Sequence, residues 1–472
     1  MILARACSSW SAILCAVVAT VISSPGRTPV VAQETYSYAY RGVIFGPYGR
    51  PWSHEDRLSV LRWMGGVGMN IYVHAPKDEI YQRAQWRDEY PAALLEQYAG
   101  EIVVARSAGV EWVPNVSPGF PLIPSPALPT GAPSRDICFS CGDDVNLLVQ
   151  KKLEPFHDLG VRTFMVSFDD VQKISTHPED AAEYGAGDAA YGRMNADLLN
   201  RLREHPSLPD STILTVPADY SGTSRTAYLE AFGEILDPAV RVMWTGTAVV
   251  SHEIRATDAA AYRRAIWPDL ETPPKLLVWD NFPVNDYNGN FFSGLGLPAA
   301  FKLNVGPYKG RRAELVEHLD GILANPMNEA EASKIPLYTV AAYLNDPLAY
   351  TDDPVPGACP YDHSDRGFVN DMGSCLAEAA WLAGITAFGG TSAGPLLDFL
   401  NQMRSTPFDR TESPVFVDRW RALREAFGTP FWQGPWNALH EEIAREGAVP
   451  DALYGDFPNT IFLFETRNHL AQ

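Results

Sequence analysis

Short apolar runs alternate with amphipathic segments along most of the chain. The runs are rich in β-branched and aromatic residues, as buried strands are. They lie at residues 41–46, 70–76, 111–118, 163–170, 212–220, 241–246, 275–282 and 320–326. Apolar residues at helical spacing predict helices that begin near Ser53 and then lie near 89–108, 144–159, 187–204, 225–235, 256–267 and 311–319. This alternation predicts an α/β fold, a (β/α)8 TIM barrel, with a doubly wound open sheet as the alternative.

The alternation of strands and helices stops near residue 346. The later segments "PLLDFLNQM", "VFVDRWRALREAF" and "WNALHEEIARE" have amphipathic helical patterns with no strands between them. We therefore predict a (β/α)8 barrel over residues 39–345, followed by a mainly helical C-terminal region over residues 346–472.

Residues 1–32 have the pattern of a signal peptide. Arg5 precedes the apolar run "WSAILCAVVATVI", and small residues that end at Ala32 offer a cleavage site. An uncleaved anchor is the alternative, but the run is shorter than the ~20 residues that span a bilayer. We expect a secreted or periplasmic protein with no stable membrane span in the mature chain.

The charge of the chain excludes some classes of partner. The formal net charge is −20, and loss of residues 1–32, which carry Arg5, Arg27 and no acid, would take it to −22. Such a charge repels polyanions, so we expect no nucleic acid and no heavily anionic polymer as partner. The sequence carries no signal for an oligomeric state.

The cysteines that would remain are Cys138, Cys141, Cys359 and Cys375. In an exported chain, Cys359 and Cys375 could close a disulfide. Cys138 and Cys141 have CxxC spacing, and no second CxxC or His pair accompanies them, so a zinc site is not predicted. The redox state of this CxxC pair stays open at this point.

Polar side chains gather where the predicted strands end. In a (β/α)8 barrel these ends meet at one face, where catalytic groups lie. The polar or glycine positions there are Gly46, Lys77, Asp169, Asp170, Tyr220, Thr245, Asp280, Asn281 and Asn325, and the aromatic residues near the same rim are Tyr48, Trp52, Tyr220, Trp244, Trp279 and Tyr287. Many polar groups beside aromatic faces suit a sugar.

The stretch "TFMVSFDDVQ" brings two adjacent carboxylates, Asp169 and Asp170, to the end of a buried strand. Either could instead cap the next helix or pair with an arginine. Adjacent residues on a strand point to opposite sides, so the two could have different roles. Crowding raises the pKa of one carboxyl, and we expect a protonated acid beside an ionised one. Lys77 could simply form a surface ion pair with Asp78 or Glu79.

Several longer motifs resemble glycoside hydrolase family 84, the β-N-acetylglucosaminidases that include O-GlcNAcase and bacterial enzymes once called hyaluronidases. The resemblance covers roughly residues 40–345. The motifs are "RGVIFGPYGRPWSHEDRL", "NIYVHAPKDEIYQRAQWRDEYP", "FDD", "WTG", "VWDNFPVNDY", "GPYKGR" and "NPMNEAEASKIPL".

The resemblance implies a substrate-assisted retaining mechanism, in which the 2-acetamido oxygen of the sugar attacks the anomeric carbon and forms an oxazoline. Asp169 would orient the acetamido N–H, and Asp170 would act as acid and then base. Gly46 and Lys77 would contact hydroxyls, and Tyr220 would support the oxazoline oxygen. The acetamido pocket would be lined by Thr245, Trp279 and Asn281, and the 4- and 6-hydroxyls would be held by Asp286 and Asn325. No metal or organic cofactor is implied.

The chain departs from the family at "FGPYG", where the family usually reads Glu-Gly-Phe-Tyr-Gly. Phe45 replaces an acid and Pro47 an aromatic residue, so we expect affinity or leaving-group preference to differ.

The sequence is compatible with three functions. The first is an exported exo-β-N-acetylglucosaminidase acting on GlcNAc-containing glycans or glycoproteins. A noncatalytic GlcNAc-binding protein and an endo-acting hyaluronidase-type glycosidase are the alternatives.

Overall fold

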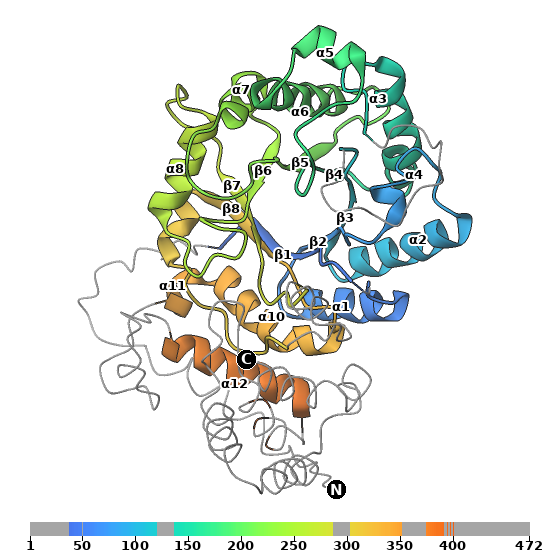
Figure 1. The fold of residues 1–472 in the computed structure, drawn as a ribbon. Coiled ribbons are helices and arrows are strands. Elements are labelled where there is room, and N and C mark those ends of the chain that lie inside the picture. Colours follow the sequence, from blue (N-terminus) through green and yellow to red (C-terminus); the bar gives the residue numbers. More distant parts are fainter. Residues whose placement is uncertain are drawn as a thin grey trace, which may run out of the picture. The chain divides into compact units, whose positions relative to one another are not determined.

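The computed structural model describes residues 37–49, 51–119, 136–286, 303–351 and 374–390, together with residues 394, 397 and 400. Its strands form one closed parallel barrel in chain order (Figure 1). They are β1 (Tyr40–Phe45), β2 (Ile71–His74), β3 (Glu111–Val116), β4 (Thr163–Ser167), β5 (Thr212–Val216), β6 (Arg241–Trp244), β7 (Leu276–Asp280) and β8 (Leu319–Ala324). Because β1 pairs with both β2 and β8, the barrel prediction is confirmed and the open sheet is wrong.

Helices surround this barrel (Figure 1). They are α1 (His54–Gly66), η1 (Ile80–Gln82), α2 (Ala92–Ser107), α3 (Gly142–Leu148), α4 (Glu154–Asp158), α5 (Pro178–Tyr184), α6 (Asp188–Arg203), α7 (Ala227–Ile235), α8 (Ala256–Ile266), η3 (Ala313–Glu317), α10 (Ala330–Asn345), α11 (Pro347–Thr351) and α12 (Ser374–Gly389). The predicted capping box is present at α1, where Ser53 accepts from the Asp56 N–H and Asp56 accepts from the Ser53 N–H. The helix predicted over 144–159 is present without interruption from Gly142 to Asp158, where α3 and α4 flank a π-helical segment at Val149–Leu153.

Strand residues alternate between the barrel interior and the layer under the helices. On β1, Ile44 belongs to the interior cluster, whereas Val43 and Phe45 belong to the outer one. The interior is filled by Ile44, Ile71, Val73, Ala75, Val113, Met165, Leu214, Val216, Met243, Leu277, Trp279 and Leu323. The mouth above this packed interior is therefore the place where polar strand ends can meet.

The outer layer holds several residues that the sequence placed at the rim. The Phe45 ring stacks on Trp52 with a centroid separation of 4.2 Å, and both are buried. Trp244 is likewise buried and stacks on Tyr262 at 5.3 Å. The rim assignment of Trp52 and Trp244 is wrong. Trp244 ends β6, and strand alternation turns its ring toward the helices. Trp52 lies in the connection before α1, where it stacks on Phe45 and donates to the Met327 carbonyl. Tyr287 lies outside the described residues.

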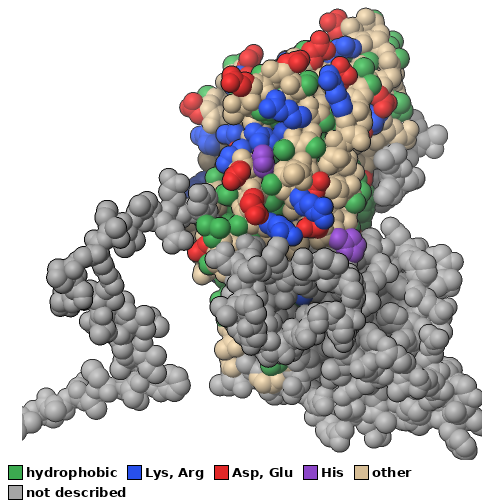
Figure 2. Space-filling view, turned by 90° about the vertical axis from the view of Figure 1, so that its left-hand side faces the viewer, with side chains coloured by type: hydrophobic (Ala, Val, Ile, Leu, Met, Phe, Trp, Pro, Cys, Tyr) green, Lys and Arg blue, Asp and Glu red, His purple; other side chains and the backbone are tan. Residues whose placement is uncertain are grey.

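After the barrel, α10 packs against α12, and Trp381 of α12 donates to the carbonyl of Val305 at 2.6 Å. Three predictions concern parts of the chain that the structure does not describe: the helices beyond α12, the signal peptide over 1–32 and a disulfide between Cys359 and Cys375. Among the described helices, none is both long enough and apolar enough to span a membrane. On the face drawn in Figure 2, acidic and basic side chains are interspersed rather than segregated by sign.

Candidate active site

A cavity of about 200 Å³ lies at the C-terminal ends of the barrel strands. The ten residues predicted for the site all line it: Gly46, Lys77, Asp169, Asp170, Tyr220, Thr245, Trp279, Asn281, Asp286 and Asn325. The remaining lining residues are Tyr48, Val216, Val249, Val250 and Val284. The cavity is smaller than the ~300–1,000 Å³ of sites for drug-sized ligands, and its size suits one sugar residue.

The two aspartates reach the same cavity because the chain turns between them. They follow the end of β4, and Asp170 has a left-handed backbone with φ of 54°. Aspartate tolerates this conformation better than most residues because its short side chain bonds locally. The expectation that strand alternation would point the two carboxylates to opposite sides is wrong.

Lys77, which follows β2, is the cation of the site. Its ammonium group bonds to Asp169 Oδ2 and lies 3.7 Å from Asp170 Oδ2. It also lies 5.0 Å from the centroid of the Trp279 ring. Lys77 therefore does not form the surface ion pair with Asp78 or Glu79. Its side chain is almost fully buried between two carboxylates and the Trp279 ring.

Asp170 is held by two tyrosines as well as by this cation. Tyr48 donates to Asp170 Oδ2 at 2.8 Å, and Tyr220 donates to Asp170 Oδ1 at 3.1 Å. Burial acts to raise the pKa of Asp170, but Lys77 and the two hydroxyls outweigh it, so the pKa lies below its usual range. Asp170 is therefore not a protonated acid in the free site. Burial and the Asp170 charge raise the pKa of both tyrosines, which remain donors.

Asp169 differs from Asp170 in having one unused acceptor. It is 5% exposed, and its Oδ1 atom is buried with no hydrogen-bond partner among the described residues. A buried carboxylate oxygen without a donor is costly, and most such groups in folded proteins are paired. Since Asp169 lines the cavity, a ligand N–H or O–H group is the natural donor for this oxygen.

A chain of amides forms another part of the cavity lining. Gly46 N–H donates to Asn325 Oδ1 at 3.1 Å, and the Asn325 amide donates to Asn281 Oδ1 at 2.9 Å. The Trp279 indole donates to the same Asn281 oxygen at 3.1 Å. Asp286 accepts from the Tyr48 N–H at 2.8 Å. The ends of β1, β7 and β8 are thus connected through side chains that line the cavity.

Gly46 fits this lining because it has no side chain. A Cβ atom at position 46 would lie 2.3 Å from a carbon of the Trp279 ring. We expect Gly46→Ala to displace the Trp279 ring, which forms part of the cavity wall. Because the sugar would then fit the cavity less well, KM for a GlcNAc glycoside should rise about tenfold or more. Gly66→Ala is the matched control because a Cβ there meets nothing within 4 Å. Equal KM values in the two variants would contradict this packing.

The wall near Thr245 is a loop fixed by hydrogen bonds. Thr245 donates to the Ala248 carbonyl at 2.9 Å, and the Asn281 amide donates to the Val249 carbonyl at 2.7 Å. Arg311 donates to the Ser251 carbonyl at 2.8 Å while binding Asp280 through two contacts of 2.7 Å. Asp280, a strand-end candidate in the sequence, therefore lies outside the cavity and supports its wall.

One group of described residues has the types and spacing of metal ligands. Cys138, His177 and Glu179 place one ligand atom each within 4.8 Å of one another. The sulfur of Cys138 is, however, bonded to Cys141, so a thiolate is not present at this position. The CxxC pair, whose state the sequence left open, is a disulfide. In the cavity itself, Lys77 can donate hydrogen bonds and the carboxylates of Asp169, Asp170 and Asp286 can accept them. This combination suits a neutral ligand with many hydroxyl groups.

Tyr48 is the residue whose role the sequence understated. The sequence predicts only an aromatic residue near the rim at this position, whereas the Tyr48 hydroxyl donates to Asp170 and its backbone N–H donates to Asp286. Phe45, in contrast, points away from the cavity, so it makes no direct contact with a ligand there. The signal available in the sequence was the tight spacing of "FGPYG", which places Gly46 and Tyr48 on the same side of the chain.

The sequence is similar to proteins of known class. Residues 41–356 match the β-N-acetylglucosaminidase family, a range that includes the cavity residues from Gly46 to Asn325. The protein O-GlcNAcases of Rattus norvegicus and Mus musculus are each 32% identical over 308 residues. That alignment covers 64% of this chain and 29% of each relative, so the chain spans under a third of their length.

Two solved structures are similar in fold and sequence. A mutant of the O-GlcNAc hydrolase of Thermobaculum terrenum is 27% identical, with a TM-score of 0.65 over 87% of this chain and 76% of its own. The structure of CpGH84B is 26% identical, with a TM-score of 0.62 over 92% of this chain and 66% of its own.

Proposed function

The chain belongs to the β-N-acetylglucosaminidases of glycoside hydrolase family 84, and on that premise we propose that it is an exported, retaining exo-β-N-acetylglucosaminidase. Its substrates would be glycans or glycoproteins that end in β-linked GlcNAc. The observation that carries the proposal is the buried, unpaired Oδ1 atom of Asp169 beside the cavity. An acetamido N–H is a donor that would satisfy it.

The first chemical step follows from this contact. When the acetamido N–H donates to Asp169, electron density shifts toward the amide oxygen, which attacks the anomeric carbon. The bond from the amide oxygen to that carbon forms as the glycosidic bond breaks. Asp170 gives its proton to the departing oxygen, so no alkoxide is released. The oxazolinium ion that results lies beside the ionised Asp169.

The second step reverses the proton transfer. Asp170, now ionised, takes a proton from a water molecule that attacks the anomeric carbon and opens the oxazoline. Two displacements on one carbon leave the β configuration retained. Tyr48 and Tyr220 keep the carboxylate oriented through both steps by their bonds of 2.8 and 3.1 Å.

Asp170 must gain a proton before the first step, although its pKa is low in the free site. A bound sugar would exclude water and draw Lys77 toward a hydroxyl, and both changes favour the neutral carboxyl. The pH profile of kcat reports the enzyme–substrate complex, and that of kcat/KM reports the free enzyme. We therefore expect the alkaline limb of the kcat profile to lie at higher pH than the alkaline limb of the kcat/KM profile.

Lys77→Met tests this electrostatic account. Removal of the ammonium group raises the pKa of Asp170, so at a given pH more of the free enzyme carries the acid proton. The alkaline limb of kcat/KM should move to higher pH, even though lost sugar contacts lower its maximum. Lys151→Met, which removes a lysine paired with Glu89 outside the cavity, should leave the limb unchanged. A limb that stays in place in Lys77→Met would contradict the account.

A cavity that suits one sugar residue favours exo action, and the charge around it favours neutral sugars. Asp169, Asp170 and Asp286 line the cavity with Lys77 as the counter-charge, and the whole chain carries −20. An anionic polymer such as hyaluronan would meet repulsion there. A noncatalytic binding protein would not need two tyrosines that fix a carboxylate near the unpaired oxygen of Asp169.

A comparison of aryl reporters tests the function. We expect rapid release from the β-N-acetylglucosaminide and no measurable release from the β-glucoside, which lacks the acetamido group. The β-N-acetylgalactosaminide, which differs at the 4-hydroxyl, should be slower if Asp286 or Asn325 holds that group. No release from the N-acetylglucosaminide, with binding of GlcNAc retained, would favour the noncatalytic alternative.

A further inference from the structure

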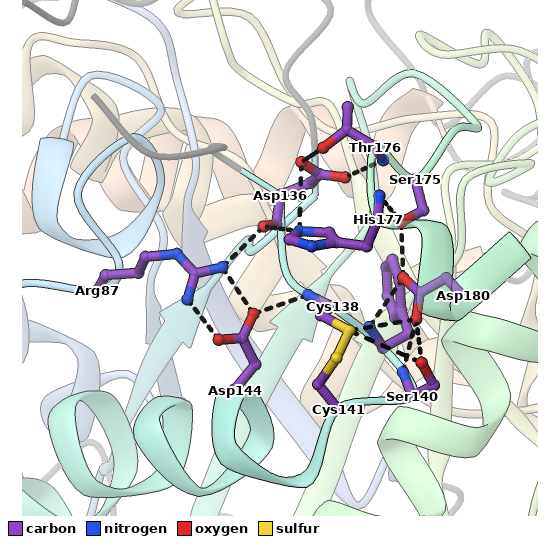
Figure 3. Close-up of polar contacts among 11 residues, drawn as sticks. Arg87, Asp136, Cys138, Ser140, Cys141, Asp144, Ser175, Thr176, His177 and Asp180 are labelled. Atoms are coloured by element: carbon purple, nitrogen blue, oxygen red, sulfur yellow. Dashed lines mark hydrogen bonds and ion pairs between the residues drawn. A yellow bond between two sulfur atoms is a disulfide. The ribbon is translucent and has the colours of Figure 1, made fainter. Parts of the chain in front are cut away.

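A small loop that contains a disulfide is joined by hydrogen bonds to the segment that follows the catalytic aspartates (Figure 3). The loop comprises residues 136–141 and contains the Cys138–Cys141 disulfide. The segment comprises residues 171–177, between Asp170 and helix α5. Two buried carboxylates, Asp136 and Asp180, connect the two. We call Asp136, Asp180 and the disulfide the carboxylate clamp.

Asp180 is the centre of the clamp and is fully buried. Its Oδ2 accepts from the Phe139 N–H at 3.0 Å and from the Ser175 hydroxyl at 2.6 Å. Its Oδ1 accepts from both the N–H and the hydroxyl of Ser140, each at 2.7 Å. A buried carboxylate needs such donors to offset its loss of hydration. Asp180 therefore holds the loop and the segment together, and loss of any of these donors would leave a buried charge with fewer hydrogen bonds.

Asp136 makes the same kind of connection from the other end of the loop. Its carboxylate accepts from the N–H and from the hydroxyl of Thr176, each at 2.7 Å, and its carbonyl contacts the His177 ring at 3.1 Å. Asp144 of α3 adds a third anchor by accepting from the Cys138 N–H at 2.8 Å while pairing with Arg87. Both ends of the disulfide loop are thus fixed to buried or paired carboxylates (Figure 3).

The loop and the segment that the clamp joins lie on the two sides of the catalytic turn. Before the turn, the ring of Phe139 in the loop packs against Phe168, with centroids 6.3 Å apart, and Phe168 directly precedes Asp169. After the turn, Ser175 and Thr176 follow Asp170 by only a few residues. Between these anchors, Asp170 holds its left-handed backbone. Such a conformation persists when the surrounding structure fixes it.

We infer that the carboxylate clamp positions Asp170 for proton transfer, so that Asp180 and the Cys138–Cys141 disulfide are positioning elements of the reaction and the activity is sensitive to reduction. This inference rests on the proposed function. Proton transfer is sensitive to placement, and about 1 Å of displacement can cost ~100-fold in rate. Loss of the clamp should therefore affect acid catalysis more than binding.

Asp180→Asn tests the clamp. Each Asp180 oxygen accepts from one backbone N–H, so either orientation of the asparagine amide sets an NH2 group against a donor. We expect kcat/KM for an alkyl N-acetyl-β-glucosaminide, a poor leaving group, to fall about 10- to 100-fold. For a dinitrophenyl glycoside, which needs no proton, we expect at most about a threefold fall. KM should change little.

Two further variants separate positioning from folding. Asp320→Asn is the matched control, since Asp320 near the start of β8 pairs with Arg241 at the start of β6, at the end of the barrel opposite the cavity. It should leave the ratio of the two substrates unchanged. Ser175→Ala removes one bond from Asp180 without leaving an amide against a donor, and should shift the ratio in the same direction by a smaller factor. An unchanged ratio in Ser175→Ala and Asp180→Asn, or equal losses on both substrates, would overturn the inference.

Reduction supplies an independent arm on the wild-type protein. Dithiothreitol transfers two electrons and two protons to the disulfide, giving two thiols and its own cyclic disulfide. We expect the same selective loss on the alkyl glycoside, reversed on reoxidation, and no response in a Cys138→Ala/Cys141→Ala variant. Wild type that hydrolyses neither substrate would defeat the proposed function. Wild type that hydrolyses both, unaffected by reductant, would defeat only the role of the disulfide.

Discussion

Asp170→Asn should lower kcat/KM for an alkyl N-acetyl-β-glucosaminide about 10³-fold, within the range expected for loss of a general acid. Asparagine tolerates the left-handed backbone at φ of 54° and keeps an acceptor for a tyrosine hydroxyl, so the fold should survive. It has no proton of suitable pKa to give to the leaving oxygen. A dinitrophenyl glycoside should be affected far less in its first step, because the dinitrophenolate departs without protonation.

Single-turnover release of both aglycones measures this difference. The slope of log rate against leaving-group pKa should be steep for Asp170→Asn and shallow for wild type. Thermal unfolding of both proteins provides the control for folding. Parallel slopes, with a uniform loss on all leaving groups, would contradict the assignment of Asp170 as the acid.

Asp169→Asn should lower the rate about 10²- to 10³-fold on every leaving group, as expected when a preorganised electrostatic contact is lost. Asp169 acts on the nucleophile and on the charge of the oxazolinium ion, and both are needed whatever aglycone departs. The neutral amide also leaves Lys77 without the partner to which it bonds in the free site.

The pattern across leaving groups distinguishes the two aspartates. For Asp169→Asn, the losses on an alkyl and on a dinitrophenyl glycoside should agree within about threefold. A selective loss on the alkyl glycoside alone would mean that Asp169, not Asp170, supplies the proton. Losses of that kind in both variants would point to a shared proton rather than to two roles.

The barrel could be predicted because its strands are short apolar runs whose period and spacing are local properties of the sequence. The eight strands lie where these runs were found, and the capping box at Ser53 is a local pattern as well. The π-helical segment at Val149–Leu153, inside the helix predicted over 144–159, was not predictable in this way, because hydrophobic periodicity does not specify it.

The cavity residues could be proposed because strand ends converge in a closed barrel, but their partners could not. Lys77 bonds to Asp169, far away in the chain, rather than to its sequence neighbours. The shared direction of the two aspartates depends on one left-handed residue. Asp280 shows the converse, since a polar strand end that looks functional is buried against Arg311. Side-chain direction and long-range pairing decide such cases, and neither is a local pattern.

The most direct test of the central claim changes the nucleophile rather than the enzyme. Aryl glycosides with successively fluorinated N-acyl groups have an amide oxygen of decreasing nucleophilicity, while the leaving group stays constant. Nucleophilic participation predicts that kcat/KM falls steeply and regularly from the acetyl to the trifluoroacetyl substrate. Rates that are indifferent to fluorination would contradict an attack by the amide oxygen and would call for a nucleophile supplied by the protein or by water.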